Sequence, residues 1–175
     1  MQEHEGNSGS IPLKSAVISP CNAYRYVLYR RGLNEGYKPV VFCMLNPSTA
    51  DHIIDDPTIR RDIGFTRRLG GSELIVVNAY ALRSTDPKEL WKAVDPIGPD
   101  NDSWIKRCAQ QVELSRDGIW ICAWGAHIQL DRQRQVLDLI RPHVDPMALG
   151  VTKHGFPRHP LYLPKDAELE HFKGE

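Results

Sequence analysis

Two side-chain amides stand beside or within apolar runs of this sequence. Residues 40–45, VVFCML, are followed by Asn46, and the run ELIVVNAYALR carries Asn78 among apolar residues. An amide offers both hydrogen-bond donors and an acceptor, so it can orient a water molecule or bind the amide edge of a ligand. Neighbouring residues give further candidates for ligand binding: Pro47, Ser48, Tyr80 and Arg83.

Two later segments add imidazole, indole and guanidinium groups. GIWICAWGAH ends with Trp124 and His127 in its last residues, and TKHGFPRHPLYL carries Arg158 and His159. Neither segment supplies a serine, a cysteine or a carboxylate pair arranged as a nucleophile. The chemistry expected of these residues therefore depends on amides, imidazoles and aromatic rings.

Capping residues predict where the helices lie. Asp56-Pro57 is typical of a helix start, and Gly70-Gly71 is typical of its end. Asp100 is expected to cap a further helix. A last helix is expected over residues 130–141, with Leu130 facing inward.

Strands and helices alternate along most of the chain, which predicts an α/β fold. The apolar runs lack a period of two, as expected for strands buried on both faces. We predict a three-layer α/β/α domain over residues 11–175, with a central, mainly parallel four-stranded sheet. The segments SAVISP and YRYVLYR predict an N-terminal hairpin that extends or covers one edge, and residues 1–10 are expected to be a disordered tail.

This topology predicts where the polar residues meet. Right-handed crossovers place the carboxyl ends of parallel strands on the same edge of a sheet. Ligands bind in sheets of this kind outside those ends. We therefore expect Asn46, Asn78 and His159 to face one shared cleft.

Composition excludes several classes of protein. The 175 residues have a formal net charge of zero, so no overall field attracts nucleic acid or anionic membranes. No apolar run approaches the ~20 residues that span a bilayer, and the first residues lack the apolar core of a signal peptide. The four cysteines are scattered, and Cys43 and Cys122 lie in apolar runs. A reducing, cytoplasmic location is expected.

Neither a metal nor a cofactor is expected. His154 and His159 lack a second pair of ligands or a cysteine cluster that would complete a zinc site. The glycine-rich loops that bind phosphates of mononucleotides and dinucleotides do not occur. Metal enzymes, nucleotide kinases and dinucleotide oxidoreductases are therefore poor candidates.

Five motifs carry a resemblance to a known family: LNPSTAD, DDPTIRR, VVNAYALR, AWGAH and TKHGFPRHPLYL. Over residues 45–163 the chain resembles a bacterial and phage family known mainly as a domain of unknown function. The same order of motifs remotely resembles the uracil-DNA glycosylase superfamily. In that superfamily an acid or amide with proline, an asparagine, a Trp-Gly pair and a His-Pro loop follow the four strands.

The glycosylase resemblance implies a fold of that type and a role for each matching residue. Asn46 would position the attacking water, and His159 would stabilise the departing base. Asn78 would bind the amide edge of a pyrimidine. Phe65 or Tyr80 would stack on the base. Such a hydrolase needs no metal or cofactor.

Departures from the glycosylase pattern leave the substrate open. Met44 stands where those enzymes usually have glycine, and Ser48 follows the proline instead of glycine or an aromatic residue. The chain is also less basic than a DNA-acting enzyme is expected to be. A nucleic acid, a nucleotide, a nucleoside or a modified base all remain possible ligands.

Structural explanations compete with the functional ones. A turn explains Asn46, a hydrogen bond within the scaffold explains Asn78, and a surface loop explains His159. Core packing is the favoured role of Trp124, whereas a helix start and contact with a ligand explain His127 equally well. Three hypotheses follow: a hydrolase of nucleobase–sugar bonds, a non-catalytic nucleobase or nucleic-acid binding module, and an enzyme of free nucleotides or modified bases. The oligomeric state is not predicted.

Overall fold

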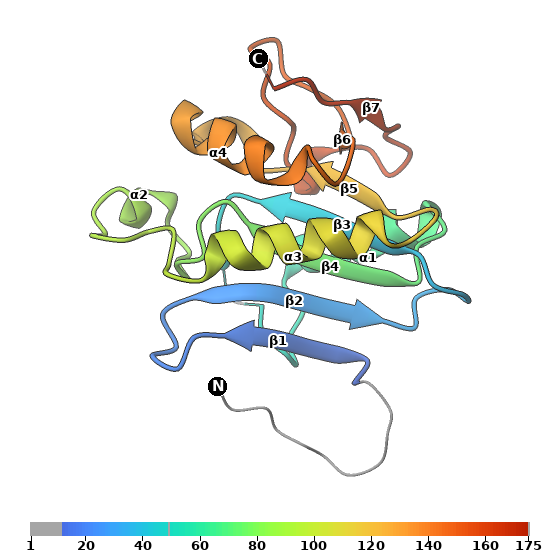
Figure 1. Ribbon diagram of the computed structural model, residues 1–175, viewed down its shortest axis with the longest axis horizontal. Helices are drawn as coiled ribbons and strands as arrows, with labels where there is room; N and C mark the ends of the chain where they lie inside the picture. Colours follow the sequence, from blue (N-terminus) through green and yellow to red (C-terminus); the bar gives the residue numbers. More distant parts are fainter. Residues whose placement is uncertain (1–11, 49, 175) are drawn as a thin grey trace.

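A seven-stranded mixed sheet forms the middle of the computed structural model, which describes residues 12–48 and 50–174 (Figure 1). The expected tail, residues 1–10, lies outside the described residues. The strands are β1 (Lys14–Ile18), β2 (Arg25–Arg31), β3 (Pro39–Met44), β4 (Glu73–Asn78), β5 (Ile119–Cys122), β6 (Pro146–Ala148) and β7 (Glu170–His171). The helices are α1 (Pro57–Arg68), α2 (Pro87–Leu90), α3 (Asn101–Glu113) and α4 (Leu130–Ile140), with 3-10 turns η1 (Gly125–His127) and η2 (Pro160–Tyr162).

The sheet order is β1-β2-β4-β3-β5-β6-β7. Parallel pairing joins β4 to β3, β3 to β5 and β5 to β6, whereas β1–β2, β2–β4 and β6–β7 are antiparallel. The α/β class is therefore as predicted. The predicted hairpin does extend one edge of the sheet, through the pairing of β2 with β4. The prediction of a four-stranded, mainly parallel sheet is corrected, because the hairpin and the unpredicted strand β7 bring the sheet to seven strands and three of its six pairings are antiparallel. Strand β2 pairs with the outer edge of β4, with Leu28 opposite Val76.

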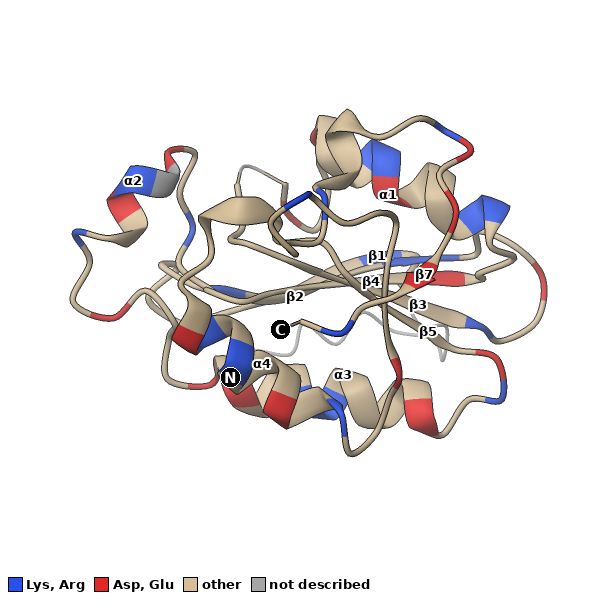
Figure 2. Cartoon of the chain, turned by 90° about the horizontal axis from the view of Figure 1, so that it is seen from above, with Lys and Arg blue, Asp and Glu red and all other residues tan. Residues whose placement is uncertain are grey.

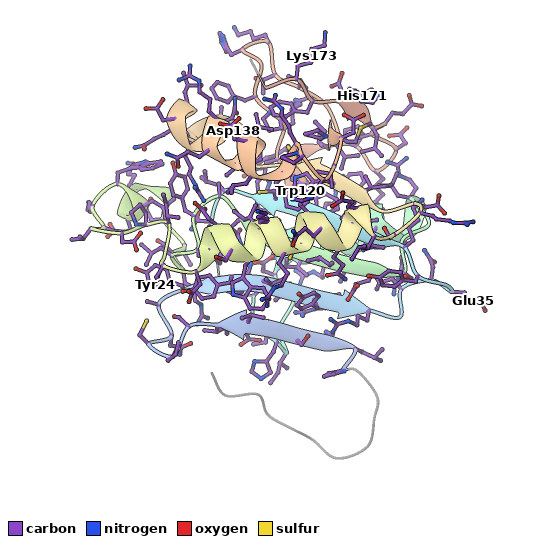
Figure 3. All side chains as sticks on the ribbon, viewed as in Figure 1. Tyr24, Glu35, Trp120, Asp138, His171 and Lys173 are labelled. Carbon is purple, nitrogen blue, oxygen red and sulfur yellow. The ribbon has the colours of Figure 1, made fainter. Side chains whose placement is uncertain are left out.

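Helices cover both faces of the sheet. Figure 2 shows α1 on one side and α3 with α4 on the other. Side chains of β3 alternate accordingly: Phe42 packs with the core under α1, and Cys43 packs with the core under α3 and α4. Trp120 of β5 packs in the core under α3 and α4 (Figure 3). Both faces of β3 are thus buried, which explains its uninterrupted apolar run.

The local signals for helix ends are partly correct. Helix α1 begins as predicted, because the Asp56 side chain accepts a hydrogen bond from the Ile59 N–H at 2.9 Å. Gly70 follows its end with a φ of 76°, which glycine adopts easily. Asp100 precedes α3 but makes no side-chain capping bond. Leu130 is 50 % exposed instead of facing inward, because it occupies the first turn of α4 beyond the edge of the core.

Two buried side chains hold the backbone where β4 ends. The amide of Asn101, at the start of α3, donates to the carbonyl oxygens of Asn78 at 2.9 Å and Ala79 at 3.2 Å. Arg132 of α4 also donates to the Ala79 carbonyl, at 2.8 Å, and pairs with Asp102 at 2.5 Å. These contacts fix the direction in which the polar end of β4 points.

We predict that Asn101→Ala lowers the free energy of unfolding by about 2 kcal/mol, because buried carbonyls lose their donor. Urea unfolding followed by tryptophan fluorescence measures this change. Lys106→Ala, at an exposed position of the same helix, is the control and should leave the midpoint unchanged. Equal midpoints for the two variants would contradict the role of Asn101.

Candidate functional site

A cleft of about 500 Å³ opens at the carboxyl ends of β3 and β4. Its walls come from the start of α1, the turn after β5 and the loop that precedes η2. Asn46, Asn78 and His159 all line it, as the predicted topology requires. Four of the other candidates line it too: Ser48, Trp124, His127 and Arg158.

The amide of Asn46 is held in one orientation. Its Nδ2 donates to the carbonyl oxygens of Ser84 at 2.8 Å and Pro47 at 3.2 Å. No described residue donates a hydrogen bond to its Oδ1. The acceptor oxygen of Asn46 is therefore the atom that can bind a water molecule or a ligand in the cleft.

Asn78 is the least satisfied polar group of the cleft. Its side chain is 1 % exposed, and neither Nδ2 nor Oδ1 has a hydrogen-bond partner among the described residues. Leaving a buried amide unpaired costs stability, so such groups are rare in scaffolds. A ligand with a complementary donor and acceptor would satisfy both atoms.

His159 presents a neutral ring with a defined tautomer. Its Nδ1 accepts a hydrogen bond from the Leu161 N–H at 3.3 Å, which places the proton of the neutral ring on Nε2. Burial lowers the pKa of His159 below its ordinary value, although the carboxylate of Asp56 opposes the shift. The imidazole therefore acts as an uncharged N–H donor at neutral pH.

Helix α1 anchors the loop that carries His159. The guanidinium of Arg61 donates to the carbonyl oxygens of Pro160 and Leu163. Gly125, in the turn after β5, neighbours the same loop, because a Cβ there would be in ordinary contact with the Cβ of His159, at 4.0 Å. One arginine of α1 is thus used to bind another part of the same chain.

Arg25 is a cleft residue that the sequence interpretation missed. It is 2 % exposed, and its Nη1 donates to the Ala50 carbonyl at 2.5 Å. Burial lowers the pKa of this guanidinium to about 10, and the carboxylates of Asp56 and Asp51 oppose that shift. Asp56, predicted only as a cap, also lines the cleft. The sequence gives little signal for Arg25, because its strand, RYVLYRR, carries two further arginines.

The structure does not bring the two expected stacking rings to the cleft. Phe65 is buried in the core between α1 and the sheet, with the guanidinium of Arg61 5.3 Å from its ring centroid. Tyr80 belongs to the core on the opposite face, where Trp91 packs edge-to-face against it at 5.4 Å. Both rings are therefore occupied by packing.

Pro47 and Arg83 are not among the cleft-lining residues either. The Pro47 carbonyl accepts a hydrogen bond from the Ser84 N–H at 2.9 Å, so Pro47 shapes the turn after β3. Arg83 donates to the Asn22 side chain at 3.0 Å and so connects two loops. Their contacts are made with the protein itself.

Trp124 serves the core even though it borders the cleft. Its indole N–H donates to Gln133 Oε1 at 3.0 Å, and its ring packs edge-to-face against Phe172. These contacts agree with the prediction that Trp124 packs in the core. His127 and Arg158 are exposed at the mouth of the cleft, where they remain accessible to a ligand.

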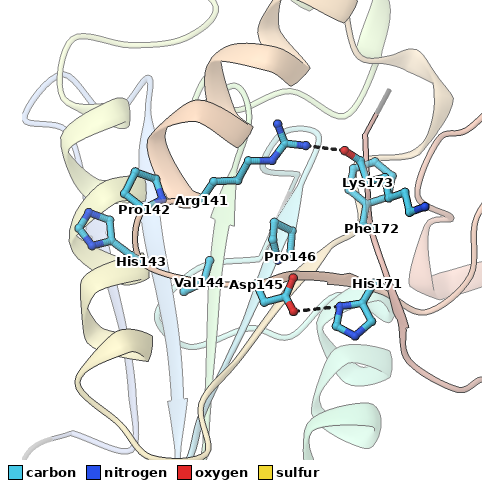
Figure 4. A pocket seen from close by; sticks show the side chains of 9 residues that line it. All are labelled: Arg141, Pro142, His143, Val144, Asp145, Pro146, His171, Phe172 and Lys173. Atoms are coloured by element: carbon cyan, nitrogen blue, oxygen red, sulfur yellow. Dashed lines mark hydrogen bonds and ion pairs between the residues drawn. The ribbon is translucent and has the colours of Figure 1, made fainter.

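A second hollow, of about 650 Å³, lies where the C-terminal segment docks (Figure 4). Arg141 binds the Lys173 carbonyl there, and Asp145 pairs with His171 at 2.9 Å. These contacts attach β7 to the chain around β6. None of the residues predicted for a site lies in this hollow.

Residues 12–48 and 50–174 contain neither a cluster of metal-binding side chains nor a membrane-spanning helix. No three His, Cys, Asp or Glu side chains gather there in a way that could hold a metal ion. No helix in this part of the chain is long and apolar enough to cross a membrane.

Residues 25–161 match the family described as "Protein of unknown function (DUF1643)". The chain belongs to this family. The matched segment runs from Arg25 to beyond His159 and so includes both asparagines of the cleft. No curated protein and no solved structure matched the chain. The resemblance to uracil-DNA glycosylases thus stays a prediction from motifs.

We predict that the His159 imidazole titrates below 6.5, the ordinary histidine pKa, and keeps its proton on Nε2 when neutral. The lowered pKa means that the unfolded chain binds this proton more readily, so stability should fall as the pH drops below 6.5. Long-range ¹H–¹⁵N spectra measure both properties, with His159→Gln to assign the signals. Titration above that value, or a proton on Nδ1, would contradict the geometry.

A buried acid of α1 gives a second pH dependence. Asp62 is fully buried, and neither carboxylate oxygen has a partner among the described residues. Burial raises the pKa of the Asp62 carboxyl well above its ordinary value, and the Asp56 carboxylate raises it further. The folded protein therefore favours the protonated acid.

We predict that Asp62→Asn gains stability relative to the natural chain as the pH rises from about 5 to about 8, because only the natural chain must keep a proton or bury a charge. Urea unfolding at both pH values measures the difference. Asp138→Asn on an exposed part of α4 is the control. The same stability difference at both pH values would show that Asp62 does not titrate in this range.

Proposed function

We propose that the cleft hydrolyses the N-glycosidic bond between a nucleobase and a sugar. The observation that carries this proposal is the buried, unpartnered amide of Asn78 in a cleft shared with Asn46 and His159. Asn78 suits recognition of the base, Asn46 suits positioning of the water, and His159 suits stabilisation of the leaving base.

Asn78 supplies the recognition of the base. The amide edge of a pyrimidine presents a carbonyl oxygen and an N–H, which complement Nδ2 and Oδ1 of Asn78. Because both atoms lack partners within residues 12–48 and 50–174, their pairing with the base removes a cost already present without ligand. A base without this edge would leave the amide unpaired and is therefore rejected.

Asn46 and His159 supply the chemistry. The Asn46 Oδ1 accepts a hydrogen bond from water and aims it at the sugar carbon of the scissile bond. As that bond breaks, negative charge develops on the base and positive charge on the sugar. The Nε2–H of His159 donates to the charged base oxygen, and a neutral donor does this without losing its proton.

A binding module without catalysis is the second candidate. Two hydrogen bonds favour this candidate: Asn46 Nδ2 donates to the carbonyls of Ser84 and Pro47. These bonds give Asn46 a structural role that explains its presence without catalysis. In that case Asn78 would still bind a base, and no bond would break.

We expect the natural chain to release uracil from single- or double-stranded oligonucleotides, or from free nucleosides and nucleotides. Asn46→Ala should lower the rate of release about 100-fold, because the attacking water is no longer held. Asn46→Asp should change the rate without abolishing it. Alkaline strand scission detects abasic oligonucleotides, and chromatography detects the released base.

Asn34→Ala serves as the control, because its amide binds the carbonyls of Arg67 and Gly71 away from the cleft. Binding of these ligands with no released base would favour the binding module. Release that is unaffected by Asn46→Ala would rule out Asn46 as the residue that positions water.

A further inference from the structure

We infer that Arg25 binds a phosphate group of the ligand in the cleft, so that the ligand is a nucleotide and not a free base or nucleoside. The anion site itself depends only on the contacts of Arg25. Its description as part of a nucleotide site rests on the proposed function, which assigns the base to Asn78.

Three arginines are 2–3 % exposed among the described residues: Arg25, Arg30 and Arg132. Arg30 is fully paired, since its Nε meets Asp55 at 2.6 Å and its other nitrogens donate to the carbonyls of Tyr29 and Asp51. Arg30 therefore has the partners that a buried cation requires.

Arg132 is paired in the same way. Its Nη2 meets the Asp102 carboxylate at 2.5 Å, its Nε donates to the Ala79 carbonyl, and its Nη1 donates to Gln135. Both of these arginines connect elements of the scaffold, and both have a carboxylate to balance their charge.

Arg25 differs from both. The only hydrogen bond of its guanidinium to a described residue is the one to the Ala50 carbonyl, and its buried Nε has none. Asp56 lines the same cleft, yet Arg25 and Asp56 form no ion pair. The carboxylates of Asp56 and Asp51 act on Arg25 only without a direct ion pair. A buried guanidinium without a directly bound anion is costly to keep, and an anionic ligand is a partner that removes the cost.

The surroundings of Arg25 favour phosphate among anions. The guanidinium fork matches two phosphate oxygens. Ser48 and Thr58 line the cleft with hydroxyl groups that can donate to a third oxygen, and Arg158 adds a second cation at its mouth. Thr58 also lies in the first turn of α1, at the positive end of the helix. Because Asp56 already caps that end of the helix, we assign the anion site to Arg25 and not to the helix end.

The sheet places this corner beside the expected base site. Strand β2 runs antiparallel to β4, so the start of β2 lies next to the carboxyl end of β4. The Arg25 N–H donates to the Ala81 carbonyl at 3.0 Å, three residues beyond Asn78. One ligand can therefore reach Asn78 with its base and Arg25 with its phosphate.

Calorimetric titration tests the inference with four probes: uridine, uridine 5′-monophosphate, inorganic phosphate and a short single-stranded oligonucleotide that contains uracil. We expect the monophosphate to bind the natural chain at least about tenfold more tightly than uridine. Arg25→Gln should remove this preference and leave the affinity for uridine within about twofold. Glutamine keeps a donor for the Ala50 carbonyl and removes the charge.

Arg107→Gln, an exposed cation on α3, is the control and should keep the preference. Equal affinities of the natural chain for uridine and its monophosphate would overturn the inference, as would a preference that survives in Arg25→Gln. So would the absence of binding by every probe. Tighter binding of the oligonucleotide than of the monophosphate would identify a phosphodiester as the source of the phosphate.

These results separate the two proposals. Phosphate binding that depends on Arg25, with no base released from any substrate, would overturn the glycosidic hydrolysis and keep the anion site. Base release at the same rate from nucleosides and nucleotides, in both the natural chain and Arg25→Gln, would overturn the anion site and keep the hydrolysis.

Unfolding without ligand gives an independent test. Arg25→Gln should keep or raise the urea midpoint, because it removes an unpaired buried charge, whereas Arg30→Gln should lower it by breaking a satisfied network. A loss for Arg25→Gln as large as that for Arg30→Gln would assign Arg25 to the scaffold and overturn the inference.

Discussion

The attachment of the end of β4 to two helices is the constraint on which the cleft depends. Asn101 of α3 and Arg132 of α4 bind the carbonyls of residues 78 and 79 from one face of the sheet. The Asn78 side chain is thereby left on the other face, in the cleft below the start of α1. A strand end held this firmly keeps a polar amide buried even though the amide has no partner in the part of the chain that the structure describes.

Buried polar atoms without a partner among the described residues lie on both faces of the sheet. Asn101 and Trp120 each have one on the α3 and α4 side, and the others are on the α1 side. Asn78, Arg25, Asp62 and Thr66 are all buried there with at least one polar atom that has no partner among the described residues. The two other buried arginines of the described residues, Arg30 and Arg132, are fully paired, so the protein is able to satisfy such groups. Of the four groups on the α1 side, only Asn78 and Arg25 line the cleft, and functional sites are where unsatisfied groups are most often kept.

Charge in the cleft differs from charge over the molecule. The sequence has 22 basic and 22 acidic residues, and Figure 2 shows them interspersed over helices and loops. In the cleft, Arg25 and Arg158 face one carboxylate, Asp56, while His159 is held neutral by burial. A small anionic ligand fits this local excess of positive charge better than a long polyanion, which needs an extended basic surface.

The sequence by itself determined the features that depend on neighbouring residues. Asp56-Pro57 and Gly70 set the ends of α1, and the apolar runs of β3, β4 and β5 required burial on both faces. Only the tertiary structure decided that β2 pairs with β4 and brings Arg25 to the cleft, and that Phe65 and Tyr80 face away from it. A cap acts across one helical turn, whereas strand pairing and the direction of a ring depend on partners that are far away in the chain.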